Sequence, residues 1–135
     1  MLNSKVTCLG NHVNIRTIRK TDYKIFMSWD DLDEKNRYFP NNNFINEIKN
    51  ESWIDRKLVD KNGIYLMIID SKTNLSIGIT IIENIDLENS IANWGIYIAK
   101  LDFMKKIYVN EAASLILNYA FENLNLTKIN ACALS

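Results

Sequence analysis

The clearest hydrophobic pattern lies in the C-terminal half of the chain, where a strand is followed by an amphipathic helix. Residues 91–99, Ile-Ala-Asn-Trp-Gly-Ile-Tyr-Ile-Ala, predict the strand, and a basic turn at residues 100–109 follows it. Asn110 is the expected N-cap of the helix, with Glu111 near its positive end. The helix has one wide apolar face, because apolar residues recur at spacings of three and four: Ala112, Ala113, Ile116, Leu117, Ala120, Phe121 and Leu124.

The pattern also predicts further strands and helices. Residues 13–18 alternate apolar and polar positions, which is typical of a half-buried strand. Two helices are expected next, one capped by Thr21 or Asp22 and reaching Trp29, and one at about residues 44–59. The other expectations are an irregular lead-in at residues 1–11, strands at residues 64–69, 75–85 and 126–134, and a bulge or close approach at Gly78.

The order of these elements predicts an α/β fold. Three consecutive strands joined by short turns favour antiparallel pairing, and a strand that follows a helix is expected to lie parallel to its predecessor. We therefore expect a mixed, mainly antiparallel central sheet with helices on both faces. A chain of 135 residues accommodates one domain, spanning residues 1–135.

The composition and charge of the chain bear on which partners it can have. The chain is 47% hydrophobic and 24% charged, as in globular proteins, and its 16 basic residues balance 16 acidic ones. Because no basic stripe is present, we expect no nucleic-acid partner. The longest apolar run, residues 64–69, is too short for a bilayer, and residues 1–12 lack a hydrophobic leader, so a cytoplasmic protein without membrane contact is expected. Cys8 and Cys132 form no metal-ligand pattern, and no metal is predicted.

Four stretches carry a family resemblance. They are Ile-Arg-Thr-Ile-Arg-Lys-Thr-Asp at residues 15–22, Ser-Ile-Gly-Ile-Thr-Ile-Ile at 76–82, Trp-Gly-Ile-Tyr-Ile at 94–98, and residues 110–129. Together they resemble the GNAT superfamily of acyl-CoA-dependent N-acetyltransferases, in the branch of the ribosomal-protein N-terminal and spermidine acetyltransferases. The resemblance implies the acyl-CoA N-acyltransferase fold, acetyl-CoA as cofactor, and direct transfer of an acetyl group to a primary amine on a small molecule or a peptide.

The chain departs from the family at the pyrophosphate-binding motif. The family has Arg or Gln, two free positions, Gly, one free position, then Gly or Ala, where this chain has Met104, Ile107 and Val109. Glycine lets a phosphate approach the backbone without a Cβ in the way, which β-branched residues do not. The resemblance still implies cofactor binding by the segment Met104, Lys105, Lys106, Ile107, Tyr108, Val109 and Asn110, and the alternative is a solvated basic turn.

The other site residues are also implied by the resemblance. In the family, the backbone of the strand at Ile96, Tyr97 and Ile98 pairs with the pantetheine arm, and a role in the core is compatible with that pairing. Asn93 stands where many relatives carry a Glu, so Glu83 is the nearest alternative general base by strand geometry. The alternative for Glu83 is a surface charge at a strand end. Tyr97 is the second catalytic candidate, and packing is its alternative.

Several residues have a simpler expectation. His12 is expected to be exposed, and Cys132 to be a small buried residue. Tyr38, Phe39 and residues 41–43 lie in the region that shapes the acceptor site in relatives, and they either line an amine pocket or plug the sheet edge.

The end of the chain leaves two functions open. The family continues after its fifth strand with a fourth helix that covers the cofactor groove, whereas this sequence stops at Ser135. The fold is therefore expected to be C-terminally short, and the uncovered apolar sheet predicts a homodimer. An acetyltransferase is the first hypothesis. The alternative is a non-catalytic GNAT-like binding or scaffold module that no longer binds acetyl-CoA.

Overall fold

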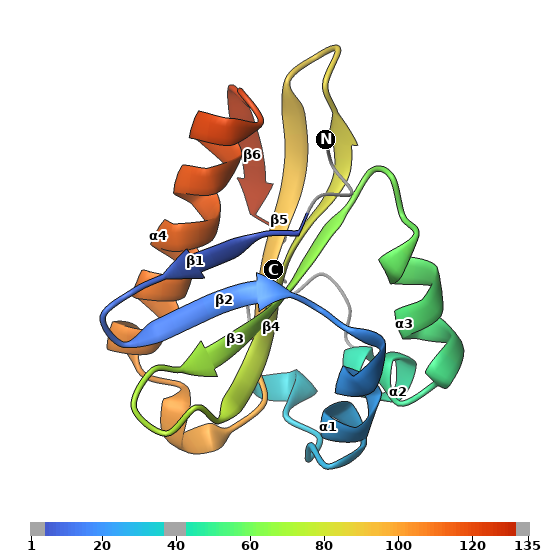
Figure 1. The fold of residues 1–135 in the computed structure, drawn as a ribbon, viewed down its shortest axis with the longest axis vertical. Helices are drawn as coiled ribbons and strands as arrows, with labels where there is room; N and C mark the ends of the chain where they lie inside the picture. Colours follow the sequence, from blue (N-terminus) through green and yellow to red (C-terminus); the bar gives the residue numbers. More distant parts are fainter. Residues whose placement is uncertain (1–4, 37–42, 132–135) are drawn as a thin grey trace.

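The protein forms a six-stranded sheet with helices on both faces (Figure 1). This computed structural model describes residues 5–36 and 43–131. The strands follow one another in chain order across the sheet, and every neighbouring pair is antiparallel except the parallel pair β5 and β6. The strands are β1 (Thr7–Leu9), β2 (Val13–Thr17), β3 (Ile64–Asp70), β4 (Ser76–Asp86), β5 (Ile91–Ile98) and β6 (Lys128–Ala131). The predicted mixed, mainly antiparallel α/β fold is confirmed.

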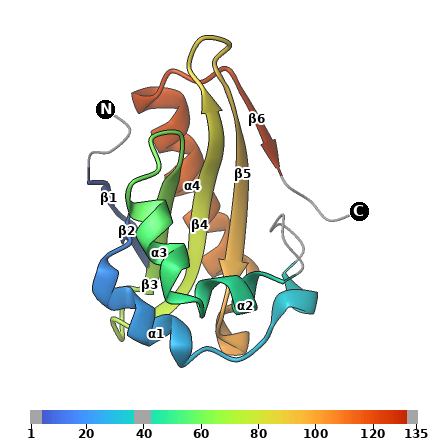
Figure 2. The same ribbon diagram turned by 90° about the vertical axis from the view of Figure 1, so that its right-hand side faces the viewer.

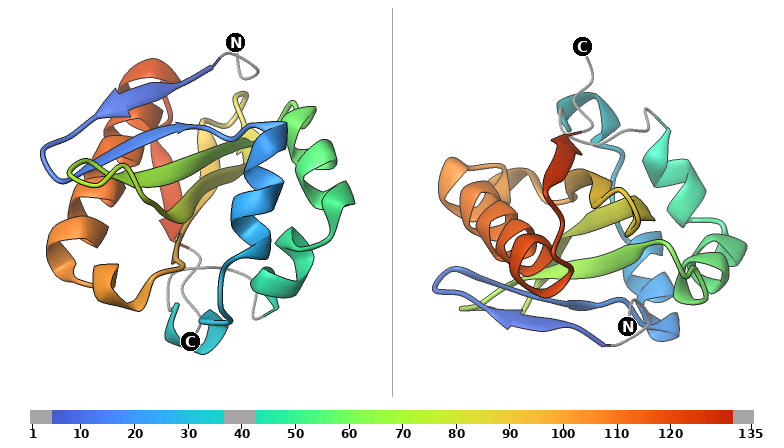
Figure 3. Two further views of the ribbon diagram at one scale, coloured as in Figure 1. Left: turned by 60° about the horizontal axis from the view of Figure 1, so that its bottom comes forward. Right: turned by 90° about the horizontal axis from the view of Figure 1, so that it is seen from above.

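The helices divide between the two faces, as the view from above shows (Figure 3). Helix α4 (Lys106–Asn123) buries Ala112, Ile116 and Ala120 against one face. Helices α1 (Tyr23–Met27), α2 (Phe44–Ile48) and α3 (Glu51–Leu58) cover the other, with Trp29 in the same core. Strands β3 and β4 are buried along most of their length, because both of their faces are covered. That explains their nearly continuous apolar sequence.

The predicted helix at residues 44–59 is two helices. Asn50 separates α2 from α3, with an extended backbone and a side chain that accepts a hydrogen bond from the Ser52 N–H at 3.1 Å. Asn50 therefore acts as the N-cap of α3, which ends the first helix and begins the second.

Helix α4 begins earlier than predicted. Its N-cap is Lys105, whose backbone is extended, and Asn110 lies inside the helix, so the N-cap prediction for Asn110 is wrong. The segment 106–109 is the first helical turn and not part of a basic loop. The sequence hides this start because Lys105 makes no side-chain cap hydrogen bond, and because Tyr108 and Val109 already pack against the core.

The lead-in also contains structure that the pattern missed. Strand β1 is short and lies at the edge of the described sheet, beside β2. The turn that follows it is held by α4, because Glu111 Oε1 accepts hydrogen bonds from the N–H groups of His12 and Val13 at 2.6 and 2.8 Å. His12 itself is exposed, as expected.

Gly78 shows both features predicted for it. The register between β3 and β4 shifts between Ile68 and Ile69, opposite residues 76–78. A Cβ at Gly78 would also collide with the carbonyl oxygen of Tyr97 on β5. A glycine is therefore required for β4 to lie at its observed distance from β5.

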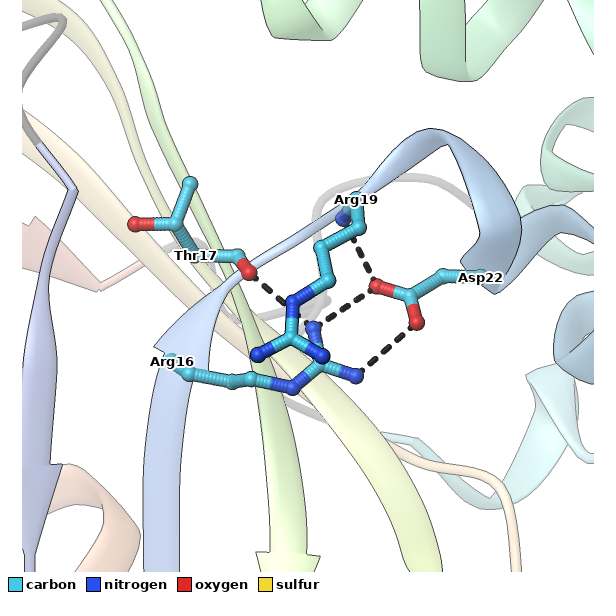
Figure 4. Close-up of polar contacts among 4 residues, drawn as sticks. All are labelled: Arg16, Thr17, Arg19 and Asp22. Atoms are coloured by element: carbon cyan, nitrogen blue, oxygen red, sulfur yellow. Dashed lines mark hydrogen bonds and ion pairs between the residues drawn. The ribbon is translucent and has the colours of Figure 1, made fainter.

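A buried ion pair closes the connection from β2 to α1 (Figure 4). The two terminal nitrogens of Arg16 contact the two carboxylate oxygens of Asp22, each at 2.9 Å. Asp22 also accepts a hydrogen bond from the Arg19 N–H at 2.8 Å, and Arg16 donates to the Thr17 carbonyl at 3.0 Å. Asp22 is the N-cap residue of α1 by position, but its side chain binds Arg16 and Arg19 and does not cap that helix.

Candidate functional site

Strand β5 is the centre of the candidate site. In the part of the chain that the structure describes, β6 runs beside it from Ile91 to Trp94, in register with Lys128–Ala131. Among the residues that the structure describes, no strand continues this pairing along 95–98. The C-terminal end of β5 and the start of α4 lie at the same end of the molecule, joined by residues 99–105 (Figures 1 and 2).

The backbone direction of Ile98 is fixed by its neighbour. The Ala99 N–H donates to the Ile77 carbonyl of β4 at 2.7 Å. Because successive residues of a strand point their hydrogen-bonding groups to opposite sides, the N–H and C=O of Ile98 face away from β4. They therefore lie on the edge of β5 that faces β6.

Asn36 binds this edge through its side chain. Its Oδ1 accepts a hydrogen bond from the Ile98 N–H at 2.6 Å, and its Nδ2 donates to the Ile98 carbonyl at 3.1 Å. The same Nδ2 donates to the Leu32 carbonyl at 2.8 Å. Asn36 is 6% exposed, and it follows the short 3₁₀ helix η2 (Asp33–Lys35). No sequence pattern singled out Asn36, because the contact joins residues 62 positions apart.

The side chain of Tyr97 lies on the face of the sheet that α1–α3 cover, in a buried network with η2. It is 1% exposed, its hydroxyl is hydrogen-bonded to the Asp33 carboxylate, and it accepts a hydrogen bond from the Leu32 N–H at 3.4 Å. Asp33 also accepts from the Ile45 N–H at 3.2 Å. Burial is the main cause that raises the pKa of Tyr97, and burial likewise raises the pKa of Asp33 above its ordinary range. Tyr97 therefore stays protonated at neutral pH.

The start of α4 offers hydrogen-bond donors to an anion. The N–H groups of Tyr108 and Val109 both donate to the Lys105 carbonyl at 3.1 Å, whereas those of Lys106 and Ile107 have no acceptor among the described residues. The side chains of Lys105 and Lys106 are exposed, as are those of Ile107 and Asn110. Two open amides at a positive helix end and two ammonium groups fit a pyrophosphate. Met104, Tyr108 and Val109 are half-buried and pack against the core.

Glu83 lies directly opposite Asn93 in the pairing of β4 with β5, so the two side chains share a face. Glu83 is half-buried and lies beside Tyr65, whose hydroxyl donates to Asp60 at 2.7 Å. Burial raises the pKa of Glu83 above its ordinary 4.5, and the negative charges of Asp60 and Glu47 add to that increase. The cation of Lys57 acts in the opposite direction.

The structure does not bring the two catalytic candidates into contact. Tyr97 pairs with Ile79 and Asn93 pairs with Glu83, so the two candidates lie four positions apart along the sheet, about 13 Å. They share the face covered by α1–α3. Glu83 lies among half-buried polar side chains, whereas Tyr97 and its partner Asp33 are both buried from solvent.

Other sequence candidates lie elsewhere. Cys132, Tyr38, Phe39, Asn41 and Asn42 fall outside the described residues. Within the described part of the chain, no cluster of His, Cys, Asp and Glu could hold a metal ion. In the same residues, no helix has the length and apolar character needed to cross a bilayer. A cavity of about 100 Å³ is lined by residues 5–7 and 16–19. It lies at β1 and β2, towards the edge of the sheet that is far from β5.

Known proteins share this architecture. A structure described as a probable acetyltransferase is 25% identical with a TM-score of 0.67, over 92% of this chain and 71% of that one. Ribosomal-protein-S5-alanine acetyltransferase from Vibrio fischeri gives a TM-score of 0.72 at 15% identity, over 92% and 72%. A variant of spermidine N-acetyltransferase from Vibrio cholerae gives 0.67 at 19% identity, over 89% and 69%.

The family comparison agrees with the structural one. No curated protein matches the chain. Residues 12–135, nearly all of the chain and all of the candidate site, match the domain described as acetyltransferase (GNAT). The chain therefore belongs to the GNAT acetyltransferase family.

Proposed function

We propose that the protein is an acetyl-CoA-dependent N-acetyltransferase that moves an acetyl group to a primary amine by direct attack. Membership of the GNAT family supports acetyl transfer in general. The observation that carries the finer proposal is the meeting of two features at one end of the molecule: the edge of β5 at residues 95–98, beside which no described strand lies, and the N–H groups of Lys106 and Ile107, which have no acceptor among the described residues. Bound acetyl-CoA would supply the activated acetyl group.

The cofactor would be held by backbone and by charge. In this proposal the strand at Ile96, Tyr97 and Ile98 offers the backbone groups of Ile96 and Ile98, which point away from β4, to the pantetheine arm. The amides of Lys106 and Ile107, with the ammonium groups of Lys105 and Lys106, bind the pyrophosphate. The remaining members of the segment form the wall of this site: Met104, Tyr108, Val109 and Asn110.

Glu83 would act as the general base. An amine is protonated at neutral pH, and it must lose a proton before its nitrogen can attack a thioester. Burial raises the pKa of Glu83 towards neutral pH. A carboxylate with such a pKa is still ionised at neutral pH and accepts a proton more readily than an ordinary one. Tyr97 would serve by fixing the end of β5 to Asp33, as a positioning residue.

The acceptor would be an amine on a small molecule or a peptide. Two structural relatives carry the names of a spermidine and a ribosomal-protein-alanine acetyltransferase, which supports both kinds of acceptor. The half-buried acidic groups around Glu83 would favour a cationic amine. We place this chemistry in the cytoplasm, where acetyl-CoA is available.

Charge reversal at the start of α4 tests the proposal. We expect micromolar binding of acetyl-CoA and of CoA in calorimetric titration, and binding about 10- to 100-fold weaker after Lys105→Glu with Lys106→Glu, because the pyrophosphate would then face two carboxylates. Lys61→Glu, an exposed change in the turn before β3, is the matched control and should leave the affinity unchanged. Absence of any binding by the unaltered protein would contradict the enzyme.

The alternative is a GNAT-like binding or scaffold module without acetyl-CoA. The observation that favours it is the presence of β-branched Ile107 and Val109 in the first turn of α4, where the family has small residues. The titration decides between the two functions.

We also propose a homodimer. Two large apolar side chains are exposed on the segment before α4 and on α4 itself, Leu101 at 57% and Phe121 at 44%. Burying them in a symmetric contact would remove this surface from water. Sedimentation velocity is expected to show a dimer at micromolar concentration, and a monomer at 100-fold higher concentration would contradict it.

A further inference from the structure

The backbone edge of β5 at Ile98, which we assign to the cofactor, is already bound by the side chain of Asn36. Asn36 satisfies both the N–H and the C=O of Ile98, at 2.6 and 3.1 Å, and does so from a buried position. A side-chain carboxamide that accepts from one backbone N–H and donates to the same residue's C=O reproduces the pairing of a neighbouring strand. Asn36 therefore pairs with the edge of β5 beyond Trp94, the last residue that pairs with a described residue of β6.

The pairing groups of Asn36 match those of the pantetheine arm. The arm contains secondary amides, and each offers one N–H and one C=O to a strand edge, as the carboxamide of Asn36 does. One N–H cannot donate a strong hydrogen bond to two acceptors at once, so the arm and Asn36 compete for Ile98. We propose that the Asn36 side chain occupies the edge of β5 at Ile98 in the free protein, and that the pantetheine arm displaces it when the cofactor binds. We call this reversible contact between Asn36 and Ile98 the latch. This inference rests on the proposed acetyl-CoA function.

The segment that carries Asn36 can release it without unfolding. Asn36 is the C-cap residue of η2, and η2 has a separate anchor, because Asp33 accepts from the Ile45 N–H and is hydrogen-bonded to Tyr97. Rotation of the Asn36 side chain would leave these contacts in place. The Leu32 carbonyl, at 2.8 Å from Nδ2, is the third partner that the side chain would give up.

The latch predicts an effect opposite to that of a binding residue. In Asn36→Ala the free protein no longer holds the Ile98 edge, so the cofactor displaces nothing. We expect CoA to bind about tenfold more tightly than to the unaltered protein, the equivalent of two modest hydrogen bonds. The variant is also expected to be less stable in thermal unfolding. Asn36→Asp, whose carboxylate can accept from the Ile98 N–H but cannot donate, is expected to lie between the two proteins.

A matched control separates the latch from general destabilisation. Asn50→Ala removes the N-cap of α3, lowers stability by a comparable amount, and lies away from Ile98. Its CoA affinity should equal that of the unaltered protein.

Hydrogen exchange of the Ile98 amide reads the same event directly. The amide is expected to be protected in the free protein, to exchange faster in free Asn36→Ala, and to regain protection when CoA is added to that variant. Equal or weaker CoA binding by Asn36→Ala, with Asn50→Ala unchanged, would overturn the latch and leave the proposed function standing. Failure of every variant to bind CoA would overturn the proposed function, and the latch with it.

Discussion

Glu83→Gln is expected to lower acetyl transfer by a factor of about 10² to 10⁴ while leaving CoA binding unchanged. Glutamine keeps the size of the side chain and its contact with Tyr65, but an amide accepts no proton from the amine. The loss should therefore appear in kcat. Initial rates with spermidine and with an alanine-first peptide, the acceptors named for the relatives, would measure it.

The same substitution is expected to stabilise the protein at neutral pH. The pKa of Glu83 is raised in the folded chain, so the folded state holds its proton to a higher pH than the unfolded state does. Stability from this group is present at low pH and is lost as pH rises through the folded pKa. Glu83→Gln removes that titration, so its melting temperature should exceed that of the unaltered protein at pH 7 and match it at pH 4.

Glu88→Gln is the control for both effects. Glu88 is exposed in the turn between β4 and β5, and its substitution should change neither rate nor melting temperature. An unchanged rate in Glu83→Gln would show that the base lies elsewhere. A higher melting temperature combined with a lower rate would show that the chain tolerates a poorly solvated carboxylate for the sake of its chemistry.

The central strands were predictable because buried strands consist of consecutive apolar residues, and this pattern is visible in the sequence. Ile64 to Ile69 are apolar since β3 is covered on both faces, and the short turns around β4 dictate its antiparallel partners. The parallel placement of β6 follows from the helix between it and β5. These features depend on neighbours in the sequence, which a pattern reports.

Features that depend on distant contacts were not predictable. The start of α4 has no capping side chain, so only the tertiary packing of Tyr108 and Val109 marks it. Strand β1 pairs with β2, and the turn between the two strands is held by Glu111 of α4, which is distant in the sequence. Asn36 and Asp33 have ordinary loop neighbours, and only the folded chain places them against Ile98 and Tyr97.

The candidate site shows the same division. Resemblance assigned the segment 104–110 and the strand 96–98 to the cofactor, and the structure places the two at one end of the molecule (Figure 2). It also showed that the backbone groups of Ile98 are already bound, which no sequence pattern contains. Backbone geometry, more than side-chain identity, makes such a site, so missing glycines alone do not decide whether it binds.

Asp22→Ala is expected to destabilise the protein by about 3–5 kcal/mol, the largest stability change that we predict. Asp22 is 2% exposed, and its carboxylate binds both Arg16 and the Arg19 N–H (Figure 4). Removing it leaves the largely buried guanidinium of Arg16 without its counter-charge and the connection from β2 to α1 without its central acceptor. Urea unfolding at pH 7 would measure the loss.

The exposed ion pair between Lys20 and Asp55 is the matched control for Asp22→Ala. Its atoms lie at 2.6 Å, closer than those of the buried pair, yet the side chains are 53% and 55% exposed. Water solvates these charges in the folded and in the unfolded chain, so Asp55→Ala should lower the stability far less than Asp22→Ala does. Similar losses in the two variants would mean that burial does not set the strength of the Arg16–Asp22 pair. A large loss in Asp22→Ala alone would show that the buried Arg16–Asp22 contact stabilises the start of the fold. Both residues lie in residues 15–22, the first of the four stretches that resemble the family.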